Sequence, residues 1–129
     1  MSDIIKKLMT KRSFKARTPA TKEQIESAEK TLGLSFSKEY IAYLMEFGCV
    51  SVYGHEYTGL CNTSRLNVVH VTITQRNYAD NIPYDWYVIE EANIDGVVIW
   101  QNSTGEIFMR APDATLLKLA NSLSEYLDQ

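Results

Sequence analysis

Three short runs of β-forming residues lie close together near the middle of the chain, and they constrain the fold more than any other feature. The runs are WYVIEE (86–91), GVVIWQ (96–101) and GEIFMRA (105–111), and the sequences NIDG and NSTG separate them. Gly, Asn, Asp and Ser in such positions favour turns. Strands joined by so few residues run antiparallel, because a parallel pair needs a long crossover. The sequence therefore predicts a three-stranded meander.

Two consecutive helices are predicted between residues 21 and 48. Thr21 and Gln24 match the Thr-x-x-Gln capping box that begins a helix, and Gly33 suits the left-handed residue that ends one. Ser37 can cap a second helix, which Gly48 closes. The apolar residues at helical spacing are Ile25, Ala28 and Leu32 in the first helix, and Tyr40, Ile41, Leu44 and Phe47 in the second. So few residues separate the two helices that we expect them to pack as a corner.

The N-terminal region and residues 66–77 give weaker signals. A short amphipathic helix is predicted within residues 1–12, where one face carries Ile4, Ile5, Leu8 and Met9. Pro19 marks residues 13–20 as a linker. Residues 66–74 alternate as a strand does, yet their apolar residues also fit a helix capped by Asn67. The local pattern leaves both structures open there.

The last segment predicts a helix, and the elements together predict the fold class. Four leucines recur at helical spacing after Asp113, which suits a cap: Leu116, Leu119, Leu123 and Leu127. Hydrophobic residues make up 45% of the 129 residues, which is enough for one core. We therefore expect a single α+β domain over residues 1–129, with an antiparallel or mixed sheet flanked by helices.

Charge is distributed unevenly along the chain. Residues 1–38 carry a balance of +5 and residues 39–129 a balance of −8, for a net charge of −3. The basic part could touch nucleic acid or an acidic surface, but its lysines alternate with acids, which favours a solvated helix face. The acidic remainder argues against direct nucleic-acid binding and suits a basic protein partner. The first residues contain no apolar leader segment and no run approaches the ~18 apolar residues of a membrane span, so we expect a soluble cytoplasmic protein without membrane contact.

The run GHEYTG (54–59) shares its His-Glu pair with the zinc-protease signature H-E-x-x-H. The second histidine of that signature would stand at position 59, which is Gly59. Glycines at both ends, Gly54 and Gly59, also disfavour the helix that the signature requires. We therefore predict that His55 and Glu56 lie in a loop or at a strand edge and serve the fold or a partner surface. No metal and no cofactor is expected.

A cysteine nucleophile is the catalytic alternative. Cys49 and Cys61 lie on either side of His55, and a Cys–His pair could form a nucleophile and its base. A buried cysteine that packs as a small apolar residue explains the same pattern. The four Cys and His residues contain no closely spaced pair of ligands, which disfavours a metal site. Adjacent Glu90 and Glu91 should point to opposite faces of a strand and cannot share a proton.

An acidic and aromatic segment is the candidate partner surface. Core packing explains aromatic residues in strands, but exposed aromatic residues supply binding energy and acids attract a basic partner. The candidate contact residues are Asp80, Tyr84, Asp85, Trp86, Tyr87, Glu90 and Glu91.

Taken together, the segments resemble the SUKH superfamily (the Smi/Knr-type domain) from about residue 21 to residue 128. TKEQIESAEKTLGLSFSKEYIAYLMEFG is similar to its two opening helices, and YGHEYTGL to its Gly-rich strand and loop. WYVIEEANIDGVVIWQNSTGEIFM resembles its sheet, and LANSLSEYL its end. Ser37 stands where the family usually has Pro, but it is still a capping residue. The resemblance also implies that residues 66–77 form a helix that ends near Arg76.

The resemblance implies function as well as fold. Family members share no catalytic set, and many bacterial members are immunity proteins that bind and block a toxin domain, often a nuclease. We therefore predict a non-catalytic immunity protein whose partner is a basic toxin domain. The alternative is an intracellular regulatory adaptor, because fungal relatives act in cell-wall regulation. An enzyme that uses His55 with a cysteine is a third hypothesis.

Overall fold

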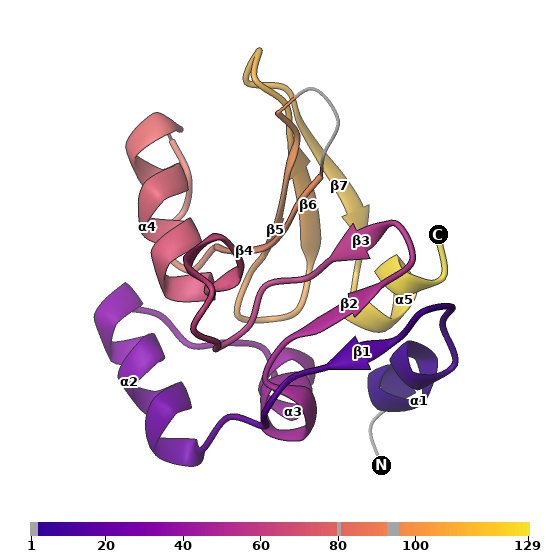
Figure 1. The fold of residues 1–129 in the computed structure, drawn as a ribbon. Helices are drawn as coiled ribbons and strands as arrows, with labels where there is room; N and C mark the ends of the chain where they lie inside the picture. The colour runs from indigo at the N-terminus through magenta and orange to yellow at the C-terminus, as the bar shows by residue number, and fades with distance from the viewer. Residues whose placement is uncertain (1–2, 80, 93–95) are drawn as a thin grey trace.

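The computed structural model describes residues 3–79, 81–92 and 96–129. Its elements in chain order are α1 (Asp3–Met9), β1 (Lys15–Ala16), α2 (Lys22–Leu32), α3 (Lys38–Phe47), β2 (Val50–Val52), β3 (His55–Glu56), a 3-10 turn (Ser64–Leu66), α4 (Val68–Tyr78), β4 (Tyr87–Glu91), β5 (Val98–Gln101), β6 (Ile107–Arg110), β7 (Leu116–Ala120) and α5 (Leu123–Leu127). The chain is a single α+β domain, as predicted (Figure 1).

The paired strands of the described residues run antiparallel and form two sheets. The sheet β4-β5-β6-β7 contains the predicted meander, and β1-β2-β3 is a smaller sheet beside it. A bridge from Tyr57 to Glu90 joins the two sheets, and the Thr58 amide donates to the Ile89 carbonyl oxygen at 2.9 Å. The register of β4 against β5 shifts between Val88 and Glu90, where a bulge adds one residue.

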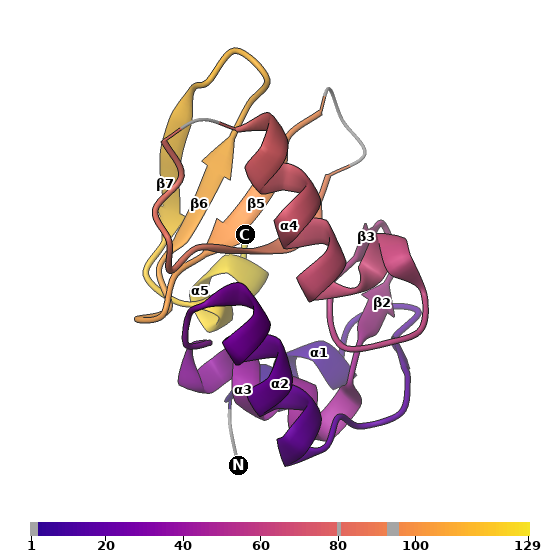
Figure 2. The ribbon, with the colours of Figure 1, turned by 90° about the vertical axis from the view of Figure 1, so that its left-hand side faces the viewer.

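The rest of the domain covers both faces of β4 and β5, whereas β7 is largely exposed. Val88, Val98 and Trp100 pack with Val71 of α4 on one face, which Figure 2 shows from the side of α4. The opposite face packs on the main core, to which Ile99 and Ile107 contribute. That core also includes side chains of α1, α2, α3 and α5. Most side chains of a strand between two such layers are therefore buried.

The predicted helix signals of residues 21–48 are confirmed. Thr21 Oγ1 accepts from the Gln24 amide at 3.1 Å, and Gln24 Oε1 accepts from the Thr21 amide at 2.8 Å. Gly33 ends α2 with φ of 71°, in the left-handed region that favours glycine. Ser37 caps α3, and Gly48 closes it. Local side-chain chemistry thus fixes both helix starts.

The helix implied for residues 66–77 is confirmed as α4. Asn67 Oδ1 accepts from the amides of Val69 and His70, which caps the first turn. The alternation in this segment is misleading because Thr72, on the polar side of the pattern, is fully buried. Its hydroxyl oxygen accepts from the Val88 amide at 3.0 Å and so ties α4 to β4.

The prediction of one C-terminal helix with an Asp113 cap is wrong. Leu116 and Leu119 lie in β7, and only Leu123 and Leu127 lie in α5. Asp113 Oδ1 accepts from the Thr115 amide in the turn before β7, whereas Ser122 caps α5. Strand pairing with β6 overrides the helical leucine spacing.

Two smaller expectations about the N-terminal region also need correction. Residues 13–20 are not wholly a linker, because Lys15 and Ala16 form β1 and pair with β2. Met9 was placed on the apolar face of the first helix, but it is exposed at the end of α1. The core takes Ile4, Ile5 and Leu8 instead.

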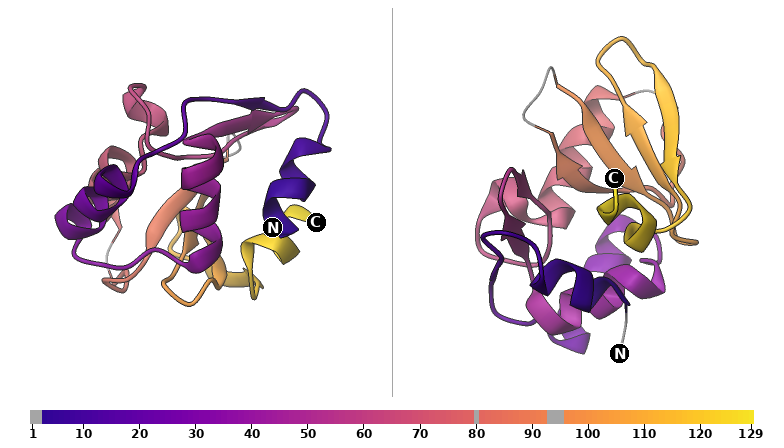
Figure 3. Two further views of the ribbon diagram at one scale, coloured as in Figure 1. Left: turned by 90° about the horizontal axis from the view of Figure 1, so that it is seen from below. Right: turned by 90° about the vertical axis from the view of Figure 1, so that its right-hand side faces the viewer.

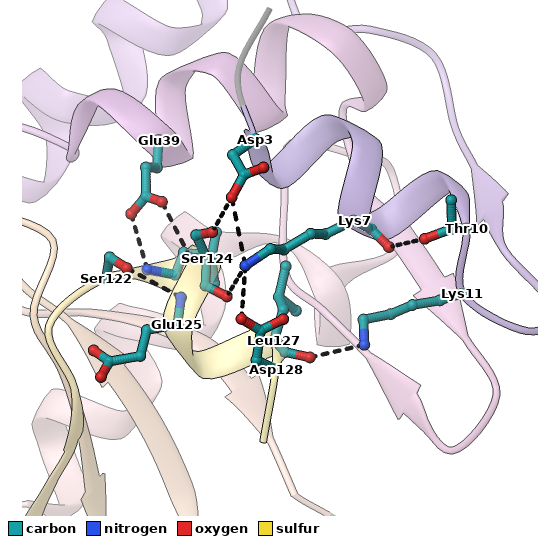
Figure 4. A network of polar contacts seen from close by, with 11 residues as sticks. Asp3, Lys7, Thr10, Lys11, Glu39, Ser122, Ser124, Glu125, Leu127 and Asp128 are labelled. Carbon is teal, nitrogen blue, oxygen red and sulfur yellow. Dashed lines mark hydrogen bonds and ion pairs between the residues drawn. The ribbon is translucent and has the colours of Figure 1, made fainter.

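Helix α1 is joined to α5 across the whole length of the chain (Figure 3, left). Lys7 Nζ donates to the Ser124 carbonyl oxygen at 3.1 Å and pairs with Asp128 at 2.8 Å. Glu39 of α3 accepts from the amides of Leu123 and Ser124 at 2.8 and 3.1 Å, so it covers the first turn of α5 (Figure 4). Three helices therefore meet through polar contacts as well as apolar packing.

Within the described residues, every helix is too short or too polar to cross a membrane.

Candidate functional site

The His-Glu pair of GHEYTG lies on an edge hairpin, not on a zinc-binding helix. Gly54 makes the turn between β2 and β3 with φ of 81°, and His55 and Glu56 form β3. Gly59 follows, where its amide donates to the Leu66 carbonyl oxygen at 2.8 Å. A turn with positive φ and a close backbone contact explain the two glycines. The location at a strand edge agrees with the sequence-based prediction.

His55 is paired with Glu90, which lies 35 residues further along the chain. His55 Nδ1 and Glu90 Oε2 are 2.5 Å apart, and Tyr126 Oη donates to Glu90 Oε1 at 2.7 Å. The Glu90 side chain is 4% exposed and the His55 side chain 51% exposed. An ionised carboxylate only accepts, so in that state of Glu90 the proton of this bond lies on Nδ1. Burial and the adjacent Glu90 charge raise the pKa of the Tyr126 hydroxyl, so it remains a donor.

Glu56 is the neighbour of His55 in sequence, but its carboxylate binds a different residue. Both of its carboxylate oxygens accept from Arg65, at 2.7 and 3.0 Å. This bidentate contact lowers the pKa of the Glu56 carboxyl. Adjacent strand residues point to opposite faces, which separates Glu56 from the His55–Glu90 pair.

A cleft of about 290 Å³ opens beside this pair. It lies between the α1–β1 connection, the β2–β3 hairpin and the C-terminal residues, and it is lined by Lys11, Arg12, Val52, Tyr53, His55, Tyr57, Tyr126, Leu127 and Gln129. We call it the His55 cleft. Its lining is rich in cationic groups and phenol rings.

The structure divides the acidic and aromatic segment into core and surface. Trp86 is buried and stacks on Phe108, with ring centroids 4.2 Å apart. Tyr87 is buried too, and its hydroxyl donates to Gln101 at 2.8 Å. Glu90 is held by His55 and Tyr126 as described above. The hypothesis that these three residues contact a partner therefore needs correction, because the domain covers them. Asp80 lies outside the described residues.

Three of the candidate contact residues remain on the surface. Tyr84 is 84% exposed, and Glu91 is exposed and accepts from Gln75 at 2.6 Å. Asp85 is half-buried and accepts from Ser103 at 3.0 Å. Arg76 of α4 donates to the Tyr84 carbonyl oxygen at 3.0 Å, so Tyr84 is held beside α4. We call Tyr84, Asp85 and Glu91 the α4-side surface.

Metal binding and cysteine catalysis find little support in the geometry. Among the described residues, no group of three or more His, Cys, Asp or Glu side chains is placed to hold a metal ion. Cys49 is buried and its thiol donates to the Tyr57 carbonyl oxygen at 3.2 Å. Burial raises the pKa of the Cys49 thiol to about 12, which suppresses the nucleophilic thiolate.

We expect Cys49 to resist alkylation in the folded protein. At pH 8 its raised pKa leaves almost no thiolate, so iodoacetamide should modify half-buried Cys61 first and Cys49 only after unfolding. Mass spectrometry of peptides from native and urea-unfolded samples measures this order. Faster modification of Cys49 than of Cys61 in the native state would contradict the assignment and revive the nucleophile hypothesis.

Sequence reasoning missed two residues of the candidate site, Tyr126 and Thr58. Tyr126 follows the buried Leu123 at helical spacing, so it looked like one more helix residue. Thr58 is buried, and its hydroxyl donates to the Val88 carbonyl oxygen at 2.8 Å. No local signal marks either residue, because their side-chain partners lie at least 15 residues away in the chain.

Comparison with known proteins gives one positive finding. A model of the SUKH_5 family, described as SMI1-KNR4 cell-wall, matches residues 1–129. The match includes the N-terminal helix, which lay outside the resemblance seen in the sequence. No curated protein matches the chain.

Proposed function

Because the chain belongs to the SUKH family, we propose that it acts by binding another protein and, more specifically, that it is an immunity protein for a toxin domain. The family match over the whole chain carries this proposal, since membership of the SUKH family supports a general role in protein–protein interaction. Immunity requires no chemistry on this chain. The proposal places it in the cytoplasm, where it would hold the toxin inactive.

The α4-side surface supports a basic partner. Tyr84 offers an exposed aromatic ring, and its carbonyl oxygen accepts from Arg76 of α4. The Asp85 carboxylate, which accepts from Ser103, follows Tyr84 in sequence. The Glu91 carboxylate accepts from Gln75 of α4. Tyrosine is enriched among residues that dominate binding energy, and acids speed association with a basic partner. A nuclease presents such a basic groove because it binds phosphates. The proposed mode of inhibition is occupation of that groove.

Reversal of charge on this surface is expected to slow association with the toxin partner. The variant Asp85→Lys with Glu91→Lys should lower the association rate at least about tenfold at low salt, because long-range attraction becomes repulsion. The partner is first identified by co-purification from the native host, and stopped-flow mixing then measures the rate at low and high salt. The parent rate should itself fall with salt, because the Debye length shortens to about 8 Å at physiological ionic strength.

A matched pair of charge reversals on α2 and α3, Glu26→Lys with Glu46→Lys, is the control for net charge. Both residues are exposed. If the two double variants slow association equally, the α4-side surface is not the contact. If the co-purified partner shows no toxic activity that the protein relieves, the immunity proposal itself fails.

A regulatory adaptor connected with the cell wall is the second candidate function. The cell-wall wording in the description of the matching model favours it. A toxin gene beside this one would support immunity, whereas recovery of a non-toxic envelope-growth factor as the bound partner would support the adaptor.

A further inference from the structure

We propose that the His55 cleft binds a carboxylate group, a role that neither the family match nor the immunity proposal assigns to it. The inference rests on the charges and rings that line the cleft and on what each lining group already binds. It does not depend on the identity of the partner proposed above.

Two cations at the cleft have no acidic partner within the described part of the chain. Lys11 Nζ donates to the Leu127 carbonyl oxygen at 2.9 Å, which occupies one of its three N–H groups (Figure 4). The Arg12 guanidinium lies 4.5 Å from the centre of the Tyr53 ring. Neither forms an ion pair with a described carboxylate, in contrast to Lys7, Arg65 and Lys118.

The backbone holds these cations beside the cleft. The Tyr53 amide donates to the Arg12 carbonyl oxygen at 2.8 Å, so the α1–β1 connection is fixed to the β2–β3 turn. Contact with the face of the Tyr53 ring leaves the edge of the guanidinium, with its N–H groups, for a ligand. A planar, two-oxygen acceptor matches that fork.

Glu90, an acidic side chain beside the cleft, already has two hydrogen-bond partners. Glu90 is 4% exposed and is paired with His55 and Tyr126. Both of its carboxylate oxygens are therefore occupied, while the second ring nitrogen of half-exposed His55 has no hydrogen-bond partner among the described residues. Tyr57 stacks on His55 with ring centroids 5.8 Å apart and adds apolar surface. Cations beside phenol rings suit an anion with an apolar body.

The size of the cleft limits the ligand. A volume of about 290 Å³ corresponds to about ten waters at the ~30 Å³ that each occupies in the liquid. A benzoate-sized molecule or one acidic side chain fits this volume. The carboxylate could belong to a small molecule or to an acidic residue of a protein.

Two-dimensional amide NMR of the labelled full chain tests the inference. Sodium benzoate is titrated against benzamide, which has the same shape without the charge. Acetyl-Ala-Glu-Ala-amide is titrated against its Gln counterpart to represent a protein side chain. We expect benzoate to shift the amides of Arg12, Tyr53 and His55, and benzamide to do so at least tenfold more weakly. A response to benzoate alone indicates a small-molecule ligand, and a response to the Glu peptide as well indicates that a protein side chain can enter.

The variant Arg12→Gln should weaken benzoate binding about tenfold, in line with the loss of one charge-assisted contact. Lys6→Gln is the matched control, since it removes one exposed charge of α1 that does not line the cleft, and it should change binding less than twofold. Arg12 is exposed, so its variant should fold, and its spectrum verifies this. The inference is overturned if neither carboxylate probe shifts the cleft amides, if benzamide equals benzoate, or if both variants weaken binding equally.

Discussion

Replacement of Gly59 by alanine is expected to destabilise the domain strongly. A Cβ atom at this position would lie 1.9 Å from the Gly48 carbonyl oxygen and 2.9 Å from the Cys49 Cα. Both obstacles are backbone, so no side chain can rotate away. The segments cannot separate easily either, because the Gly59 amide donates to Leu66 and its carbonyl oxygen accepts from the Val68 amide. We expect a loss of at least about 3 kcal/mol, a large share of the 5–15 kcal/mol typical of a domain.

Gly54→Ala provides the matched control in the same motif. Nothing lies within 4 Å of a Cβ at Gly54, so this variant pays only for its positive φ of 81°. That strain costs about 1–2 kcal/mol. Urea unfolding followed by circular dichroism measures both variants. If the two variants unfold at the same urea concentration, backbone crowding does not explain why position 59 is glycine.

The loss of one hydroxyl, in Tyr43→Phe, is expected to cost about 2–4 kcal/mol. Tyr43 Oη accepts from the Val50 amide at 2.9 Å and donates to the Thr58 carbonyl oxygen at 2.6 Å. Phenylalanine fills the same space but leaves both backbone groups buried without a partner, at about 1–3 kcal/mol each. Burial also raises the pKa of this hydroxyl well above its usual range, so it stays protonated and able to donate at any physiological pH.

Tyr53→Phe is the control for removal of a phenol hydroxyl. Tyr53 is 66% exposed, and water replaces whatever its hydroxyl binds. Its free energy of unfolding should stay within about 0.5 kcal/mol of the parent. A Tyr43→Phe variant as stable as Tyr53→Phe would mean that water or a backbone shift satisfies Val50 and Thr58.

Structure that depends on neighbouring residues could be predicted from the sequence. The capping box at Thr21 and Gln24 and the left-handed Gly33 act within one or two turns, and both were correct. The meander was predicted correctly because strands joined by such short turns pair antiparallel. β7 was missed because it forms on β6, and its leucines satisfy the helical spacing without being helical.

The candidate site was predictable only in its parts. His55 and Glu90 were both selected, for different reasons, but their pairing depends on the bridge between Tyr57 and Glu90 that joins the two sheets. Trp86 and Tyr87 were placed on a binding surface because a sequence does not reveal that both faces of β4 are covered. Tyr84, which precedes the strand, escapes that cover.

The contact between α1 and α5 has a consequence for biosynthesis. Lys7 binds residues 117 and 121 positions away, so α1 leaves the ribosome long before its partner helix exists. Until α5 forms, one of the surfaces that will cover α1 is missing. The side chains affected are Ile4, Ile5 and Leu8, which are all buried in the folded domain. Contacts of such high sequence separation slow folding. The nascent chain therefore completes its core only with α5, and a ribosome that stalls before residue 123 would leave the apolar face of α1 exposed for chaperones to bind.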